Sequence, residues 1–203
     1  MKRTFLLLFF LFNLHIAYAQ QVDNYRQDTT TLYQRTKGFY SDPMRSKWKQ
    51  ELKQEGDAWV LSLYNRKKVL QEKITFTDQN LEERRGPYAF YKNGHIKEEG
   101  NYDKGYKHGE WKYYDANAQL AEKVTYSWDK LHGASVTYWD NGQLKASKNY
   151  VKGIKVGECK FYYKDGKIAL NEVYDENGSL VTGAYFDEHG KAVGAAYVNK
   201  VFD

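Results

Sequence analysis

A repeat of 24 residues constrains this sequence more than any other feature. Four aliphatic residues recur at that interval, and each is followed six positions later by a tyrosine. The aliphatic column holds Ile96, Leu120, Leu144 and Ile168, and the tyrosine column holds Tyr102, Tyr126, Tyr150 and Tyr174. Two further columns keep the same interval after a first step of 23, namely Gly86, Gly109, Gly133 and Gly157, and Tyr91, Tyr114, Tyr138 and Tyr162. Four columns in one register predict a single structural unit that is used several times.

Each unit has the pattern of a β-hairpin. A short aromatic run is followed by a tight turn and then by a longer run, and Asn93-Gly94, Asn141-Gly142 and Asp165-Gly166 are typical hairpin turns. The second unit has Asn117-Ala118 instead, so we expect a wider or strained turn there. Weaker units on both sides extend the array to about six units over residues 57–203.

These units predict an all-β fold: an elongated antiparallel meander of stacked 24-residue hairpins, either open or rolled into a half-barrel. Aromatic residues lie on both faces of the short strand, with Trp111 and Tyr113 on one side and Tyr114 on the other. A thin ribbon accommodates this pattern better than a sandwich with one buried face.

The first 19 residues are typical of a signal peptide. Lys2 and Arg3 precede an apolar run, and Ala17-Tyr18-Ala19 provides a small-residue cleavage site. A membrane anchor is the rival interpretation, but a spanning helix needs roughly 20 apolar residues. We therefore expect residues 1–19 to be removed and the protein to be exported, to the periplasm or outside the cell.

Residues 20–56 lie outside the repeat pattern. They begin as a polar leader, and Asp42-Pro43, Met44, Trp48 and Leu52, followed by Gly56, predict a short N-terminal helix. This helix would cover the first edge of the sheet, or bind a partner.

Charge and cysteine content exclude several classes of function. Without Lys2 and Arg3, 29 basic residues stand against 26 acidic ones, and the two signs are mixed along the chain. A nucleic-acid partner is therefore excluded, and membrane lipid is disfavoured. Cys159 is the single cysteine, so no internal disulfide forms, and its place in the repeat predicts a structural role.

No catalytic template fits the sequence. The four histidines outside the first 19 residues, His95, His108, His132 and His189, form no cluster with metal-ligand spacing. Hydrolase elbows, zinc-protease motifs and phosphate-binding glycine loops have no counterpart in the chain. We expect no enzymatic activity, no cofactor and no metal.

Residues Tyr102–Trp111, with their tyrosine, glycines and His-Gly pair, resemble the MORN repeat. The period is closer to the MORN-repeat variant of bacterial proteins, many of which are similar to the YwqK-type antitoxin family. The first and fourth units depart from it, with Arg85-Gly86 and Val156-Gly157 in place of His-Gly. The resemblance implies stacked hairpins and a role in protein scaffolding or, more contentiously, in binding acidic phospholipids.

Three non-catalytic functions remain. The first is a protein-interaction scaffold in the cell envelope or outside the cell, and the others are an antitoxin or immunity-type neutralising protein and a glycan-binding module that uses surface Tyr and Trp rings. Another protein is the expected partner, with a glycan as the alternative. The expected binding surface is an aromatic ladder of Tyr91, Trp111, Tyr114, Tyr138, Trp139 and Tyr162, although the same rings could instead form the core of the ribbon.

Overall fold

The computed structural model describes residues 48–202, which form one 12-stranded antiparallel sheet followed by a short helix. The strands are β1 (Lys49–Glu55), β2 (Ala58–Tyr64), β3 (Leu70–Phe76), β4 (Arg84–Lys92), β5 (His95–Asp103), β6 (Tyr106–Tyr114), β7 (Leu120–Ser127), β8 (Lys130–Tyr138), β9 (Leu144–Val151), β10 (Ile154–Tyr162), β11 (Ile168–Tyr174) and β12 (Leu180–Tyr185). The helix is α2 (Ala195–Phe202).

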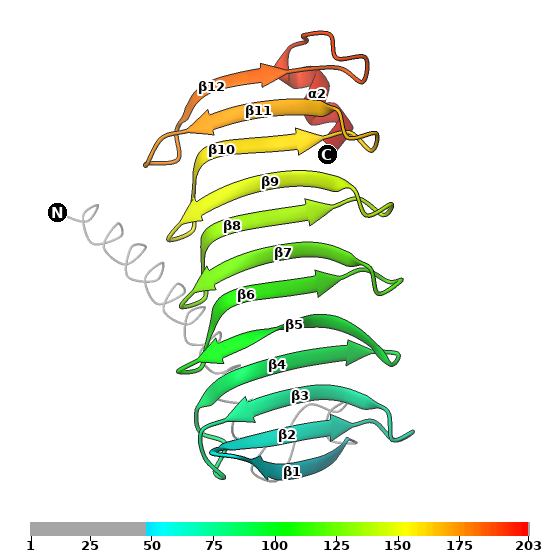
Figure 1. Ribbon diagram of the computed structural model, residues 1–203, viewed down its shortest axis with the longest axis vertical. Coiled ribbons are helices and arrows are strands. Elements are labelled where there is room, and N and C mark those ends of the chain that lie inside the picture. Colours follow the sequence, from blue (N-terminus) through cyan, green and yellow to red (C-terminus); the bar gives the residue numbers. More distant parts are fainter. Residues whose placement is uncertain (1–47, 203) are drawn as a thin grey trace, which may run out of the picture.

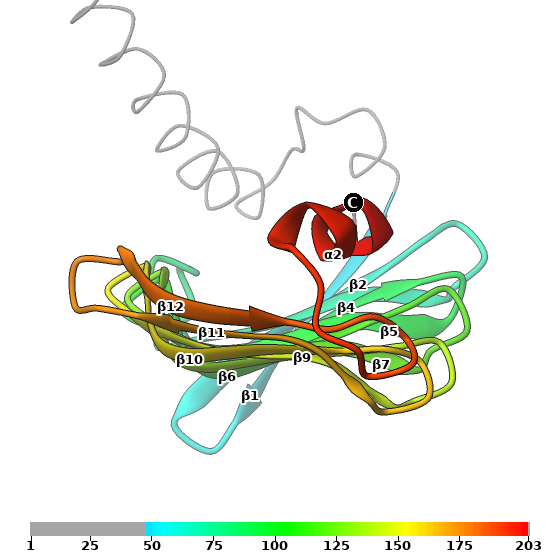
Figure 2. The same cartoon turned by 90° about the horizontal axis from the view of Figure 1, so that it is seen from above.

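The sheet is an open meander. Each strand pairs with its neighbours in the sequence, and Figure 1 shows them stacked in chain order with β1 and β12 at opposite ends. Seen from above in Figure 2, β1 and β2 are turned relative to the later strands, as the natural twist of a sheet requires, and α2 lies on one face. The predicted meander is confirmed, and the sheet is open, not rolled.

The glycine and tyrosine columns of the repeat are cross-strand partners of each other. Each repeat glycine pairs with the tyrosine of the following strand: Gly86 with Tyr102, Gly109 with Tyr126, Gly133 with Tyr150, and Gly157 with Tyr174. All four glycines have positive φ, between 67° and 103°. A side chain at these positions would be strained, which explains why glycine recurs there.

The sheet has two different faces, which we name by their residues. The core face carries Trp111 and Phe161, and the open face carries Glu99 and Lys112. On the core face, one apolar cluster extends from β2 to β7 and includes Leu61, Ile74, Phe76, Tyr88, Tyr102, Trp111 and Val124, all buried. The Tyr102 ring meets the rings of Tyr88 and Trp111 edge to face, at centroid distances of 5.3 and 5.1 Å, and the Tyr88 and Trp111 rings are tilted by 32° at 5.5 Å.

A second apolar cluster closes the C-terminal end of the core face. Val198 of α2 is fully buried against residues of β10 and β11, and Phe202 packs 5.5 Å from the ring of Phe161. The weaker unit predicted at the C-terminal end of the array contains β12 and one bridge, Phe186 with Ala192, before the chain turns into α2. The helix replaces the missing second strand as a cover for the apolar face.

The predicted N-terminal helix is wrong where the structure describes it. Lys49–Glu55 form β1, and Gly56 lies in the β1–β2 turn with φ of 63°. Leu52 pairs with Leu61 and packs with Trp48 against the core-face cluster, so the four-residue spacing of these side chains reflects the two-residue period of a strand. The first edge of the sheet is β1 itself, so the described residues contain no helix that covers this edge. The predicted signal peptide and most of the predicted leader, including Asp42 to Met44, lie outside the described residues.

Candidate functional site

The four tyrosines of the predicted ladder occupy equivalent positions near the ends of β4, β6, β8 and β10. Tyr91, Tyr114, Tyr138 and Tyr162 pair with Ile96, Leu120, Leu144 and Ile168, in each case at a register shift. All four are half-buried. The two sequence columns thus form one row across the sheet, with aromatic and aliphatic residues alternating from strand to strand.

Tyr114 connects this row with the open face through a hydrogen bond to Glu99. Its hydroxyl donates a hydrogen bond to Glu99 Oε1 over 2.6 Å, and Lys112 Nζ lies 3.6 Å from the same oxygen. Burial, and then the bond to Glu99, raise the pKa of Tyr114 to about 12, so the phenol stays protonated at neutral pH. It is therefore a hydrogen-bond donor anchored on a carboxylate.

The two tryptophans of the predicted surface lie elsewhere. Trp111 is fully buried on the core face, where its indole N–H donates to the carbonyl of Asn101 over 3.1 Å. Trp139 donates to the carbonyl of Tyr162 over 2.9 Å, and its ring packs 5.9 Å from that of Phe202. Trp111 therefore cannot present its ring to a ligand, and Trp139 is held against the C-terminal helix.

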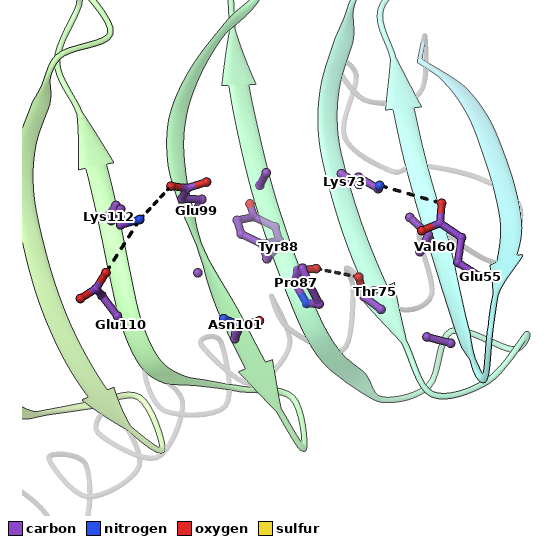
Figure 3. Close-up of a pocket in the computed structure, with 13 residues that line it drawn as sticks. Glu55, Val60, Lys73, Thr75, Pro87, Tyr88, Glu99, Asn101, Glu110 and Lys112 are labelled. Carbon is purple, nitrogen blue, oxygen red and sulfur yellow. Dashed lines mark hydrogen bonds and ion pairs between the residues drawn. The ribbon is translucent and has the colours of Figure 1, made fainter.

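A groove of about 590 Å³ lies on the open face, across β1 to β6. Figure 3 shows charged side chains from separate strands projecting over it. Its apolar lining comes mainly from Ala58, Val60, Pro87 and Ala89, and Thr75 donates a hydrogen bond to the Pro87 carbonyl over 2.7 Å. The groove includes residues of β1 and β2, the strands that are turned relative to the later ones in Figure 2.

Opposite charges alternate along this groove. Lys112 Nζ lies between Glu99 and Glu110, at 3.6 and 3.8 Å, and Lys73 Nζ lies 3.9 Å from Glu55 (Figure 3). Each of these side chains is more than a third exposed. Such pairs contribute about 0–1 kcal/mol each, so their charges can be re-paired with those of a bound molecule at little cost.

Sequence reasoning did not single out these groove residues. The lysines and glutamates alternate along the strands, a pattern that also indicates an ordinary solvated surface. Strand pairing brings them together: Glu99 of β5 is the direct register partner of Lys112 of β6, and Glu110 lies two residues before Lys112 on the same strand. Tyr114 is the predicted residue that the structure brings to the groove, through its bond to Glu99.

The residues considered for redox or metal chemistry have structural environments. Cys159 is buried at the position equivalent to Trp111, and burial raises the pKa of its thiol. Within residues 48–202 no three His, Cys, Asp or Glu side chains gather closely enough to hold a metal ion. The ring of exposed His108 lies 5.4 Å from that of Trp128 at a turn.

No helix in the described part of the chain is both long and apolar enough to span a membrane.

Comparison with protein families identifies the repeat. The family described as MORN repeat variant matches four segments, residues 88–104, 107–127, 131–152 and 155–170. These segments run from the middle of β4 to the start of β11 and include all six residues of the predicted ladder. No curated protein sequence matches the chain.

Solved structures give weak likenesses. TarM is 12% identical over 69% of this chain, with a TM-score of 0.36. A mutant of S. aureus TarM, in complex with fondaparinux, α-GlcNAc-glycerol and UDP, is 12% identical over 68% of this chain, with a TM-score of 0.29. The GtfA/B complex bound to UDP and GlcNAc is 13% identical over 81% of the chain, with a TM-score of 0.19. The chain spans about a quarter of each of these proteins, at 26–28% of their length.

Proposed function

Because its four central repeats place this chain in the MORN-repeat variant family, we propose that it is a non-catalytic protein that binds a segment of another protein along the open-face groove. Repeats of this family generally mediate interactions with proteins or membranes and carry no catalytic centre. The observation that carries the proposal is the groove, where apolar lining residues and re-pairable charges of both signs lie together.

The groove suits a polypeptide better than a uniformly charged ligand. Lys73 and Lys112 alternate with Glu55, Glu99 and Glu110, so a ligand of one sign would meet repulsion at every second contact. A protein segment with mixed charges can pair with both signs and place apolar side chains over Val60 and its neighbours.

Tyr114 provides an anchor at this groove. Its ring is half-buried and its hydroxyl is fixed on Glu99, so binding a partner against it would restrict few additional rotamers. Tyr138 and Tyr162 continue the row beyond the groove. A partner longer than the groove would meet the same type of contact at every second strand.

The cellular site we propose is outside the cytoplasm. Support comes from the first 19 residues, with their basic start, apolar run and Ala-Tyr-Ala end. Mass spectrometry of the protein recovered from its producing cells should give a mature chain that begins at Gln20. Recovery of an intact Met1 start from the same fraction would contradict export by cleavage.

The binding function is tested with immobilised mature protein and an envelope extract. Wild type should retain one dominant protein, and the double variant Lys73→Glu/Lys112→Glu should retain at least about tenfold less, because like charges then line the groove. The matched control is Lys160→Glu, which removes an ion-paired lysine of the same sheet far from the groove. Circular dichroism should show all three proteins folded.

Two outcomes would contradict the proposal. One is equal retention by wild type and the groove variant, and the other is the absence of any specific protein. Retention on polysaccharide gels that Tyr114→Ala abolishes would favour the glycan alternative instead.

A further inference from the structure

The two edges of the sheet differ in chemistry. β1 has the sequence KQELKQE, with four charged residues among seven, whereas β12 has LVTGAY, with none. Charged side chains on an edge strand oppose pairing with another strand, because pairing would desolvate them. β1 is therefore protected against edge association, and β12 lacks this protection.

Most of the outer edge of β12 is accessible in the described part of the chain. The strand pairs with β11 alone, and the returning chain bonds only its C-terminal end, through the Val193 N–H to the Tyr185 carbonyl at 2.9 Å and the Phe186–Ala192 bridge. Leu180 and Val181 are 50% and 65% exposed. Figure 1 shows β12 at the end of the stack, with α2 beside its C-terminal part.

We propose that β12 pairs antiparallel with β12 of a second copy of this chain, about a two-fold axis at Thr182. Because the Tyr185 end is closed, the accessible segment is residues 180–184, and Thr182 is its middle residue. Pairing about this centre places Leu180 opposite Ala184, and Val181 opposite Gly183, of the second copy. Threonine meets threonine at the axis, a favourable cross-strand pair.

The β12 edge of a second copy fits this edge better than the β1 edge of a second copy does. Pairing β12 with β12 brings no charges together, whereas pairing β12 with β1 would bury Lys and Glu against Leu180 and Val181. The symmetric contact also closes, so it yields a dimer and not a filament. With one short strand per copy the contact is small, and a dissociation constant of about micromolar is expected.

The dimer extends the proposed function without depending on it. A two-fold axis through an edge-paired sheet runs perpendicular to the sheet, so both open faces point the same way. The two grooves would lie at the far ends of a continuous sheet, roughly 80 Å apart for strands spaced about 4.8 Å. Such an arrangement would present two binding sites on one side of the assembly.

Sedimentation velocity of the mature chain tests the proposal. Wild type should change from monomer to dimer between about 1 and 200 µM. Val181→Lys should remain monomeric over this range, because it places a charge on the edge of each copy. Gln54→Lys, which adds the same charge to the β1 edge, should dimerise like wild type.

A cross-link distinguishes this register from other contacts. Thr182→Cys should give a covalent dimer on mild oxidation, because directly opposed residues have Cβ atoms within about 5.5 Å, and the buried Cys159 does not compete. Gln54→Cys should stay monomeric. A wild type that is monomeric throughout, a Val181→Lys dimer, or equal cross-linking at both positions would overturn the proposal, whatever the outcome of the groove experiment.

Discussion

Single residues decide how well each turn fits the repeat. Ala118 has φ of 62°, at the position where Gly142, Gly166 and Gly190 stand in later units. Its turn keeps the hydrogen bonds of the others: Asp115 N–H donates to the Gln119 carbonyl over 2.9 Å, as Trp139 does to Gln143 over 2.8 Å. The strained alternative predicted for this turn is confirmed, and the turn is not widened.

We expect Ala118→Gly to stabilise the protein by about 0.5–1 kcal/mol. Glycine removes the steric cost of the left-handed conformation, and this gain exceeds the additional chain entropy of the unfolded state. The measurement is urea unfolding followed by circular dichroism. Asn117→Gly is the control, because residue 117 has no positive φ, and it should stabilise nothing. Equal effects of the two changes would refute the strain at Ala118.

Tyr88 links the stability of the core face to pH. Its hydroxyl donates to Glu72 Oε1 over 3.0 Å, and burial followed by the nearby Glu72 charge raises the pKa of Tyr88 far above its ordinary value of about 10. A group whose pKa is raised on folding contributes fully below its unfolded pKa and loses that contribution at higher pH. The tyrosine therefore stabilises the fold at neutral pH and ceases to do so above about pH 10.

Tyr88→Phe should cost about 1–3 kcal/mol at pH 7, because Glu72 loses this donor in a buried site. The stability difference between wild type and the variant should narrow as pH rises above about 10, because the phenol then ionises in the unfolded wild type and this favours unfolding. Urea unfolding between pH 7 and 11 measures both effects. Tyr106→Phe, at a ring that is 48% exposed, is the control and should change little. A difference that stays constant with pH would argue against this coupling.

At the scale of elements, neighbouring strands are matched in side-chain size. A Cβ atom at Gly100 of β5 would lie 2.3 Å from the Trp111 ring of β6. In the next two units Val124 and Lys148 replace the glycine, and the buried residues beside them are the smaller Ser135 and Cys159. A large residue on one strand is thus accommodated by a small one on the adjacent strand.

This matching predicts strong coupling between Gly100 and Trp111. Gly100→Ala should cost about 1–3 kcal/mol in wild type, because the buried indole has little room to move. In a Trp111→Ser background, which itself costs about 3–5 kcal/mol, the same glycine change should cost almost nothing. A double-mutant cycle of unfolding free energies measures the coupling. Additive effects would mean that the indole moves aside freely.

The sequence predicts the hairpins, their number and their order, because the same 24-residue unit recurs along the chain. β1 could not be predicted, since Trp48 and Leu52 fit a helical spacing as well as a strand spacing, and pairing with β2 decides between them. The groove also escaped prediction, because its lining residues, from Glu55 on β1 to Lys112 on β6, come from six strands, and their alternating charges look like an ordinary solvated surface in the sequence. Trp111 was misplaced for a related reason: an aromatic residue on a two-faced strand does not indicate which face is covered.

At the scale of the whole molecule, each hairpin contacts only its neighbours, so the array behaves as a chain of nearest-neighbour interfaces. Removing one complete unit should therefore leave a shorter array with the same register. Deletion of residues 133–156 joins His132 to Gly157 and keeps the glycine at its place in the strand. Val124 would then face Cys159 in place of Ser135, another small buried residue.

We expect the 24-residue deletion to fold and to unfold cooperatively, with a moderately lower melting temperature, as measured by circular dichroism. Deleting residues 133–157, one residue more, should abolish cooperative unfolding. A slip of one residue turns every following side chain to the opposite face, so Cys159 and Phe161 would leave the core face while Lys160 entered it. If both deletions behaved alike, the register of the repeat would not be what holds the hairpins together.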